Sequence, residues 1–186
     1  MGRFDFYVTV LPGLQLVQRK PMQDARGFFA RFYCADEFRA AGVDKPMVQM
    51  NHTLTTHQGA VRGLHFQHSP YAEIKLVSCI AGAVFDVAVD LRAGSPTFLR
   101  WHGEVLSAEN QRSLLIPEGF AHGFQALTAD CELLYLHSAT YQPGSEGAVN
   151  IIDPSVAIQW PLPVADLSAR DRAHPYLEPD YSGIRL

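Results

Sequence analysis

Between residues 47 and 140 the sequence consists of short apolar runs that polar or breaking residues interrupt at close intervals. The runs are rich in Val, Ile, Leu and Phe, which favour strands. Turn signals such as Gln58-Gly59 and Ala81-Gly82 separate them. Many short strands with regular turns are typical of a β-sandwich or jelly roll rather than an α/β sheet. The expected strands cover residues 47–55, 60–67, 74–80, 83–91, 98–106, 112–116, 122–126 and 131–140.

The segments on either side of this block are less regular. Upstream, we expect a short strand at 14–17, a hairpin around Gly27 and a helix at 35–41 that ends at Gly42. Downstream, we expect a last strand or two within 149–160. Residues 161–186 should then fold back as a short helix or an ordered extension. No linker or shift in composition divides the chain, so the pattern predicts one all-β domain, 1–186, with short peripheral helices.

Three basic side chains lie where apolar residues are expected. Arg62 and His65 fall within one predicted strand, and Lys75 lies between Ile74 and Leu76. An isolated buried charge is costly, but a polar pocket inside a β-barrel would accommodate all three. In a regular strand Arg62 and His65 face opposite ways, so both can line one cavity only if the strand bulges at Gly63. For Lys75 the alternative is that its ammonium group reaches solvent.

Two other strands carry polar residues at alternate positions. Asp86 and Asp90 share a face of an otherwise apolar strand, where they are expected to balance arginine and lysine charges. A second face either meets solvent or forms a recognition surface inside the barrel, and it consists of Gln49, Asn51, Thr53 and Thr55.

Composition narrows the classes of function. The net charge of −4 and a pI near 6.0 argue against a nucleic-acid partner. No apolar run approaches the roughly 20 residues that span a bilayer, and the N-terminus lacks a signal-peptide pattern, so we expect a cytoplasmic protein without a membrane partner. Cys34, Cys79 and Cys131 have no CxxC spacing and are expected to be reduced.

The polar residues also belong to motifs that follow one another in a definite order. The most specific are Asp24-Ala-Arg-Gly-Phe-Phe29, Gln49-Met-Asn51, Arg62-Gly-Leu-His-Phe-Gln67, Asp86-Val-Ala-Val-Asp90 and Ile116-Pro-Glu-Gly-Phe-Ala-His-Gly-Phe124. In these motifs the chain resembles the dTDP-4-dehydrorhamnose 3,5-epimerase family from about residue 14 to residue 171. The resemblance implies a cupin-type jelly roll (a double-stranded β-helix), a homodimer and an isomerase that uses no metal or other cofactor.

The resemblance also implies a substrate and a reaction. The substrate would be a nucleoside-diphosphate 4-keto-6-deoxyhexose, a dTDP-sugar epimerised at C3, C5 or both. The family's commonest product leads to rhamnose for surface polysaccharide such as the lipopolysaccharide O-antigen. By position, His65 matches the general base, Asp171 its carboxylate partner, Lys75 the cation near the C4 oxygen and Tyr135 the acid on the opposite face.

Further positions match the family's substrate contacts. Tyr141 would stack on the base, and arginine suits a diphosphate because its donors are arranged as a fork. Two departures are expected to bear on ligand preference: Arg31 replaces a frequent glutamate, and Ile152 lies where a tryptophan is common. The matched contact residues are Arg26, Phe28, Gln49, Asn51, Arg62, His122, Tyr141, Glu146 and Arg170.

Three alternatives stay open on the residues alone. A metal-dependent cupin enzyme, such as a dioxygenase, would use His65 and His122. However, such sites have His-x-His, and His65-x-x-His68 places its two rings on opposite faces of a strand. A second alternative is a sugar-nucleotide binding module without catalysis. Tyr135, finally, could be no more than an aromatic side chain of the core.

Overall fold

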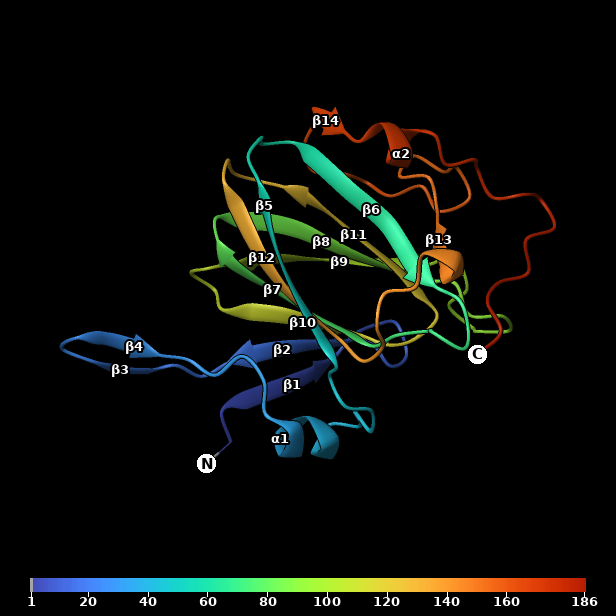
Figure 1. The fold of residues 1–186 in the computed structure, drawn as a ribbon. Coiled ribbons are helices and arrows are strands. Elements are labelled where there is room, and N and C mark those ends of the chain that lie inside the picture. Colours follow the sequence, from blue (N-terminus) through green and yellow to red (C-terminus); the bar gives the residue numbers. More distant parts are fainter. Residues whose placement is uncertain (1) are drawn as a thin grey trace.

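Two antiparallel sheets face each other in the computed structural model, which describes residues 2–186 (Figure 1). The first sheet has the order β1-β2-β10-β7-β12-β5, and the second has the order β13-β6-β11-β8-β9, with β14 added parallel to β6. The elements of the first sheet are β1 (Phe4–Val8), β2 (Gln15–Arg19), β10 (Arg112–Ile116), β7 (Lys75–Ala81), β12 (Cys131–His137) and β5 (Gln49–Thr55). Those of the second are β13 (Glu146–Ala148), β6 (Ala60–Gln67), β11 (Phe120–Ala126), β8 (Ala83–Asp90), β9 (Trp101–Ser107) and β14 (Asp166–Leu167).

The core between the sheets explains the strand pattern. Val77 and Leu133 of the first sheet and Ala88 and Phe124 of the second belong to one buried cluster. Alternate residues of β8, such as Val87 and Val89, point the other way. This architecture is a cupin-type jelly roll, which confirms the fold class expected from the sequence.

The C-terminal part of the chain covers the outer face of the second sheet. Ile151, Val156 and Ile184 pack with Val87 and Val89 of β8 in a second buried cluster. This cover explains why β8 is apolar on both faces, as is typical of a strand buried on both sides. Within the tail, the short helix α2 (Ala169–Arg172) lies beside β6 (Figure 1).

Three strand predictions need correction. The strand expected at 131–140 ends at His137, and the strand expected at 98–106 begins only at Trp101. No strand forms within 149–160, where side chains of Asn150 and Asp153 instead accept hydrogen bonds from the backbone N–H groups of Ile152 and Ser155. Such local bonds compete with a sheet ladder and favour turns. The last strands are β13 and β14, on either side of that segment.

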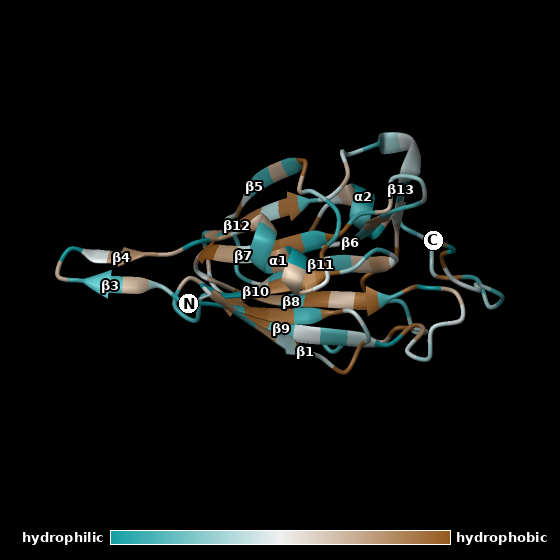
Figure 2. Cartoon of the chain, turned by 90° about the horizontal axis from the view of Figure 1, so that it is seen from below, coloured by the Kyte–Doolittle hydropathy of each residue, from teal (hydrophilic) through white to brown (hydrophobic). Residues whose placement is uncertain are grey.

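A two-stranded hairpin projects from the body of the molecule (Figures 1 and 2). It consists of β3 (Met22–Asp24) and β4 (Gly27–Phe29). Its aromatic side chains Phe28 and Phe29 are exposed, and Arg26 forms an ion pair only with Asp24 of the same hairpin. The predicted hairpin around Gly27 is therefore present, but it is not folded onto the barrel.

The remaining helices are small. Helix α1 (Ala35–Ala40) confirms the helix predicted at 35–41. It packs through Phe38 against Phe4 and Leu115. The 3-10 helix η1 (Pro143–Ser145) precedes β13. Among residues 2–186, no helix is both long and apolar enough to cross a membrane.

Candidate active site

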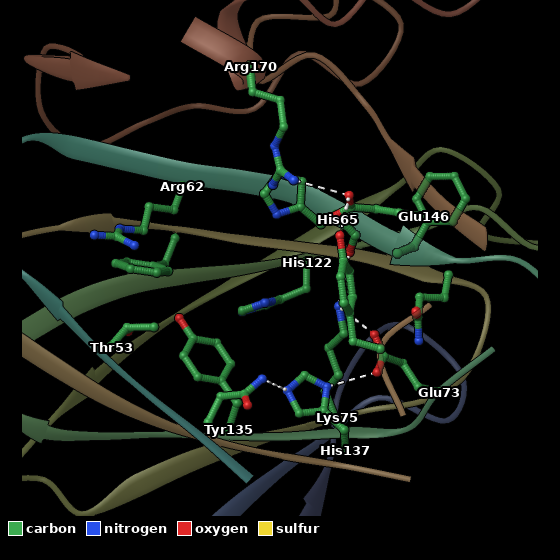
Figure 3. Close-up of a pocket in the computed structure, with 15 residues that line it drawn as sticks. Thr53, Arg62, His65, Glu73, Lys75, His122, Tyr135, His137, Glu146 and Arg170 are labelled. Atoms are coloured by element: carbon green, nitrogen blue, oxygen red, sulfur yellow. Dashed lines mark hydrogen bonds and ion pairs between the residues drawn. The ribbon is translucent and has the colours of Figure 1, made fainter. Parts of the chain in front are cut away.

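A cavity of about 280 Å³ lies between the two sheets, and polar side chains from both of them line it (Figure 3). Base candidates and acid candidates therefore face one pocket. Its lining consists of Asn51, Thr53, Arg62, His65, Phe66, Gln67, Glu73, Lys75, His122, Phe124, Tyr135, His137, Tyr141, Glu146 and Arg170.

His65 and Asp171 form a hydrogen-bonded pair at the wall of this cavity. His65 Nε2 lies 2.7 Å from Asp171 Oδ1, and the carboxylate is buried. Asp171 lies in the first turn of α2, which Ser168 caps: Ser168 Oγ accepts a hydrogen bond from the Asp171 N–H (3.0 Å). The Gly63 N–H also donates to Asp171 Oδ2 (3.5 Å). The pair thus joins residues that lie far apart in the sequence.

Opposing effects set the charge of this pair. Burial raises the pKa of Asp171, but the hydrogen bond and the charge of His65 outweigh burial and hold that pKa below its ordinary value. Burial lowers the pKa of His65, and Asp171 opposes that effect only in part. Asp171 is accordingly a carboxylate, and His65 Nε2–H donates to it. The imidazole Nδ1 keeps a lone pair that can accept a proton.

A bulge at Gly63 turns Arg62 and His65 toward the same cavity, as predicted. His122 pairs with His65 and Phe124 pairs with Arg62, so that two residues of β6 lie opposite one of β11. Gly63 has φ +123, and a Cβ there would lie 2.5 Å from the Gly123 Cα. Only glycine fits this close crossing of two strands.

Lys75 is buried, and its ammonium group does not reach solvent. Its Nζ donates to the His65 carbonyl oxygen (3.1 Å) and lies 3.2 Å from Glu73 Oε1. Burial alone would raise the pKa of Glu73, but the hydrogen bond from His137 and the charge of Lys75 hold it below its ordinary value. The lysine is thus fixed at the cavity by a carboxylate and a backbone oxygen.

Tyr135 and His122 come from β12 and β11. Burial raises the pKa of Tyr135 above its ordinary value, so the phenol is protonated at neutral pH. Its ring packs edge-on against His122, with 5.9 Å between centroids. Figure 3 shows Tyr135 across the cavity from His65. The tyrosine therefore does more than fill the core, because it also lines the cavity.

The prediction that the two aspartates of β8 balance arginine and lysine charges holds for Asp90 alone, and neither aspartate pairs with Arg62 or Lys75. Asp86 Oδ1 lies 2.8 Å from His122 Nε2. Asp90 forms an ion pair with Arg92 (2.7 Å), and the hydrogen bonds of Arg92, Ser95 and Thr97 hold its pKa near 2 against the effect of burial. The alternation of residues along β8 shows that the aspartates share a face, but it could not show that their partners are His122 and Arg92 rather than Arg62 and Lys75.

Most of the predicted contact residues gather at the cavity. Asn51, Arg62, His122, Tyr141, Glu146 and Arg170 line it. Gln49 Oε1 accepts a hydrogen bond from the Tyr141 N–H (3.0 Å) at its rim. The polar face of β5 is thus a cavity wall, while Met50 and Leu54 on its other face are exposed.

Two predicted contacts lie elsewhere. Arg26 and Phe28 are on the projecting hairpin and are not among the residues that line the cavity of their own chain. In the opposite sense, Glu73 and His137 line the cavity although no motif points to them. The only signal is parity, since each lies two residues from a predicted catalytic residue, Lys75 or Tyr135.

The described residues contain one group that could hold a metal ion: His65, Asp171 and His174, whose ligand atoms lie within 4.8 Å of one another. Arg170 Nη2 lies 3.2 Å from His65 Nε2, and Arg170 Nε lies 3.7 Å from Asp171 Oδ1. A cation would have to displace this guanidinium. The donor set therefore suits a proton relay better than a metal.

The geometry defines a class of protein. A histidine backed by a carboxylate, a buried lysine and a protonated tyrosine surround one cavity of a jelly roll. These are the groups that an enzyme needs to remove and return a proton next to a carbonyl.

Comparison with known proteins identifies the family. The chain belongs to the dTDP-4-dehydrorhamnose 3,5-epimerase family, whose sequence profile matches residues 8–179. A dTDP-4-dehydrorhamnose 3,5-epimerase of Salmonella typhimurium is 45% identical over 172 residues, 91% of this chain and 93% of the relative. The family predicted from the motifs is thereby confirmed, and it is a family of isomerases.

Solved structures of epimerases are similar to this chain in fold and in sequence. A dTDP-6-deoxy-D-glucose-3,5-epimerase of Legionella pneumophila in complex with dTDP-4-keto-L-rhamnose is 41% identical, with a TM-score of 0.87 over 91% of this chain and 90% of that chain. A 3'-monoepimerase of Streptomyces bikiniensis in complex with dTDP-quinovose is 36% identical, with a TM-score of 0.84 over 90% and 85%. Relatives of this fold thus include both double and single epimerases.

Proposed function

We propose that this protein epimerises C3, C5 or both of a dTDP-4-keto-6-deoxyhexose; inversion of both carbons would convert dTDP-4-dehydro-6-deoxy-D-glucose to dTDP-4-dehydro-L-rhamnose. One observation carries the proposal: His65 of one sheet, hydrogen-bonded to Asp171 of α2, and a protonated Tyr135 of the other sheet face a common cavity. Inversion needs a base and an acid on opposite sides of one carbon.

The reaction follows from the placement of these groups. His65 Nδ1 takes the proton from C3 or C5, and the electrons of that C–H bond move through the adjacent carbon to the C4 oxygen. Lys75 stabilises the negative charge on that oxygen, and Asp171 stabilises the imidazolium. Tyr135 O–H then gives a proton to the same carbon from the other face. Solvent restores both groups, and no electrons are gained or lost, so the proposed reaction requires no cofactor.

We further propose that the protein works as a homodimer in which the hairpin of one subunit supplies Arg26 and Phe28 to the cavity of the other. The hairpin's position supports this, because it projects from the body and exposes two phenylalanines. Arg31 lies next to the hairpin, where Arg31 Nη1 is 3.4 Å from Glu37 Oε1. Ile152 is exposed on the tail. Both are expected to influence ligand preference.

We also propose that the reaction takes place in the cytoplasm, as a step that precedes the synthesis of rhamnose-containing surface polysaccharide. Cys34, Cys79 and Cys131 are all free thiols, which fits a reducing compartment.

Exchange with solvent deuterium tests the proposal. The protein is incubated with the 4-keto sugar nucleotide in D₂O, and the C3 and C5 protons are followed by NMR. We expect loss of the proton signal at every carbon that is inverted, with His65→Asn as the inactive control. Binding of the substrate by a folded protein without exchange at either carbon would refute the enolate mechanism and leave a binding module.

A further inference from the structure

A continuous chain of hydrogen bonds runs from the rim of the cavity to its buried end. It begins at Tyr141, whose N–H donates to Gln49 Oε1 (3.0 Å). Gln49 Nε2 is 3.4 Å from Asn51 Oδ1, and Asn51 Nδ2 is 3.3 Å from His137 Nε2. His137 Nδ1 lies 2.8 Å from Glu73 Oε2. The last two residues are almost completely buried, and Figure 3 shows His137 beside Glu73.

Every donor and acceptor along this chain has a defined direction. Glu73 is a carboxylate and can only accept, so His137 Nδ1 carries the hydrogen. His137 Nε2 can then accept from the Asn51 amide nitrogen, which leaves the Asn51 amide oxygen for Gln49. At the far end the Tyr141 backbone N–H can only donate, so it fixes the Gln49 oxygen toward itself. Reversing any one amide would oppose two donors or two acceptors.

We propose that His137 and Glu73 are positioning residues that fix the Asn51 amide in the orientation that meets the substrate. The inference rests on the proposed function, in which Asn51 contacts the sugar nucleotide. Asn51 is exposed to the cavity, and among residues 2–186 its side chain has hydrogen-bond partners only in the side chains of Gln49 and His137. Without His137 the Asn51 amide group could rotate, and its oxygen would no longer be held toward Gln49 Nε2.

Glu73 has a second role that His137 lacks. Its other oxygen, Oε1, lies 3.2 Å from Lys75 Nζ. One carboxylate therefore positions both His137, which holds Asn51, and Lys75, the cation proposed to stabilise the charge on the C4 oxygen. The two residues should therefore differ in kinetics. Loss of His137 should affect binding alone, whereas loss of the Glu73 charge should affect both binding and turnover.

The experiment measures KM and kcat for the 4-keto sugar nucleotide and, by calorimetry, the Kd of dTDP-glucose, which lacks the ketone and cannot react. His137→Ala should raise KM and Kd about three- to tenfold, the effect of one lost hydrogen bond, and leave kcat within about twofold. Glu73→Gln should raise Kd to a similar extent and lower kcat as well. His52→Ala is the matched control. His52 pairs with Glu132 on the outward face of β5 and β12, the strands that carry Asn51 and His137 on their inner face.

A double-mutant cycle gives the decisive readout. If His137 acts through Asn51, adding His137→Ala to Asn51→Ala should change the Kd of dTDP-glucose no further. Additive effects, or a lower kcat with unchanged Kd in His137→Ala, would overturn the inference. Imidazole ¹⁵N NMR of the unmodified protein tests the same chain if a variant does not fold: an Nε2–H tautomer of His137 would contradict it. Exchange of substrate deuterium by the unmodified protein remains a separate test of the proposed function.

Discussion

Two histidines of the second sheet lie side by side, each paired with a carboxylate, and the two pairs differ in their exposure. His65 and His122 are direct partners across β6 and β11, and their Nε2 atoms lie 2.7 and 2.8 Å from Asp171 and Asp86. The His65 side chain is 25% exposed, whereas that of His122 is 5% exposed. Both histidines line the cavity, but much more of the His65 side chain is exposed than of the His122 side chain.

The origin of the carboxylates explains this difference. Asp171 comes from α2, outside the sheet, and bonds from Ser168 and Gly63 hold it behind His65. Asp86 belongs to β8, the neighbouring strand, and its Oδ2 has no hydrogen-bond partner among the described residues. Because Asp171 approaches His65 from outside the sheet, the free ring nitrogen of His65 can turn toward a ligand. The His65–Asp171 pair therefore suits proton transfer, and the His122–Asp86 pair suits binding.

The largest difference between the pairs should appear in the histidines. His65→Asn should lower kcat by about 10³-fold, because it removes the proposed general base, and should change the Kd of dTDP-glucose little. His122→Asn should mainly raise that Kd. Steady-state kinetics and calorimetry on both variants test this; equal losses of kcat would mean that the pairs are not functionally distinct.

Tyr135, on the opposite sheet, allows a second test. Tyr135→Phe keeps the ring that packs on His122 but removes the proposed acid. Inversion should fall by about 10²-fold. Deuterium should still enter from the His65 side with retention of configuration. NMR of the recovered sugar nucleotide distinguishes these outcomes, and loss of exchange together with inversion would assign the tyrosine a role in binding.

The carboxylate behind the base should matter less than the base itself. Asp171→Asn should lower kcat roughly 10-fold to 100-fold, since the imidazole remains but loses its partner. Asp171 raises the pKa of His65 against the effect of burial, so its removal should lower that pKa. Because the base acts when neutral, the acidic limb of the pH profile of kcat/KM should move to lower pH. A shift to higher pH would contradict the assignment.

The smallest effect is expected at the enclosed pair. Asp86→Asn keeps an oxygen that can accept from His122, so kcat/KM should change by less than about tenfold and the free energy of unfolding by about 1 kcal/mol. Chemical denaturation and the same kinetic assay measure both. A loss as large as that of Asp171→Asn would show that Asp86 also takes part in proton transfer.

The sequence predicted the fold because short apolar runs and turn residues are local signals. The bulge at Gly63 could also be predicted, since Arg62 and His65 have opposite parity. Asp171 could be found only through the family resemblance, because no local pattern links it to a residue 106 positions away. Glu73 and His137 carry no motif, and their pairing depends on strands that meet only in the folded chain. The turns of residues 149–160 were missed because side-chain bonds to the backbone outweighed an apolar pattern.

The extra residue at Gly63 also puts the two halves of β6 out of phase. Before it, even-numbered positions such as Arg62 face the cavity, and after it odd-numbered positions such as His65 do. If β6 kept all of its residues but lost the bulge, Arg62 would still face the cavity and His65 would point to the other side of the sheet. The position of the His65 side chain therefore depends on the extra residue of this strand as much as on the identity of the side chain.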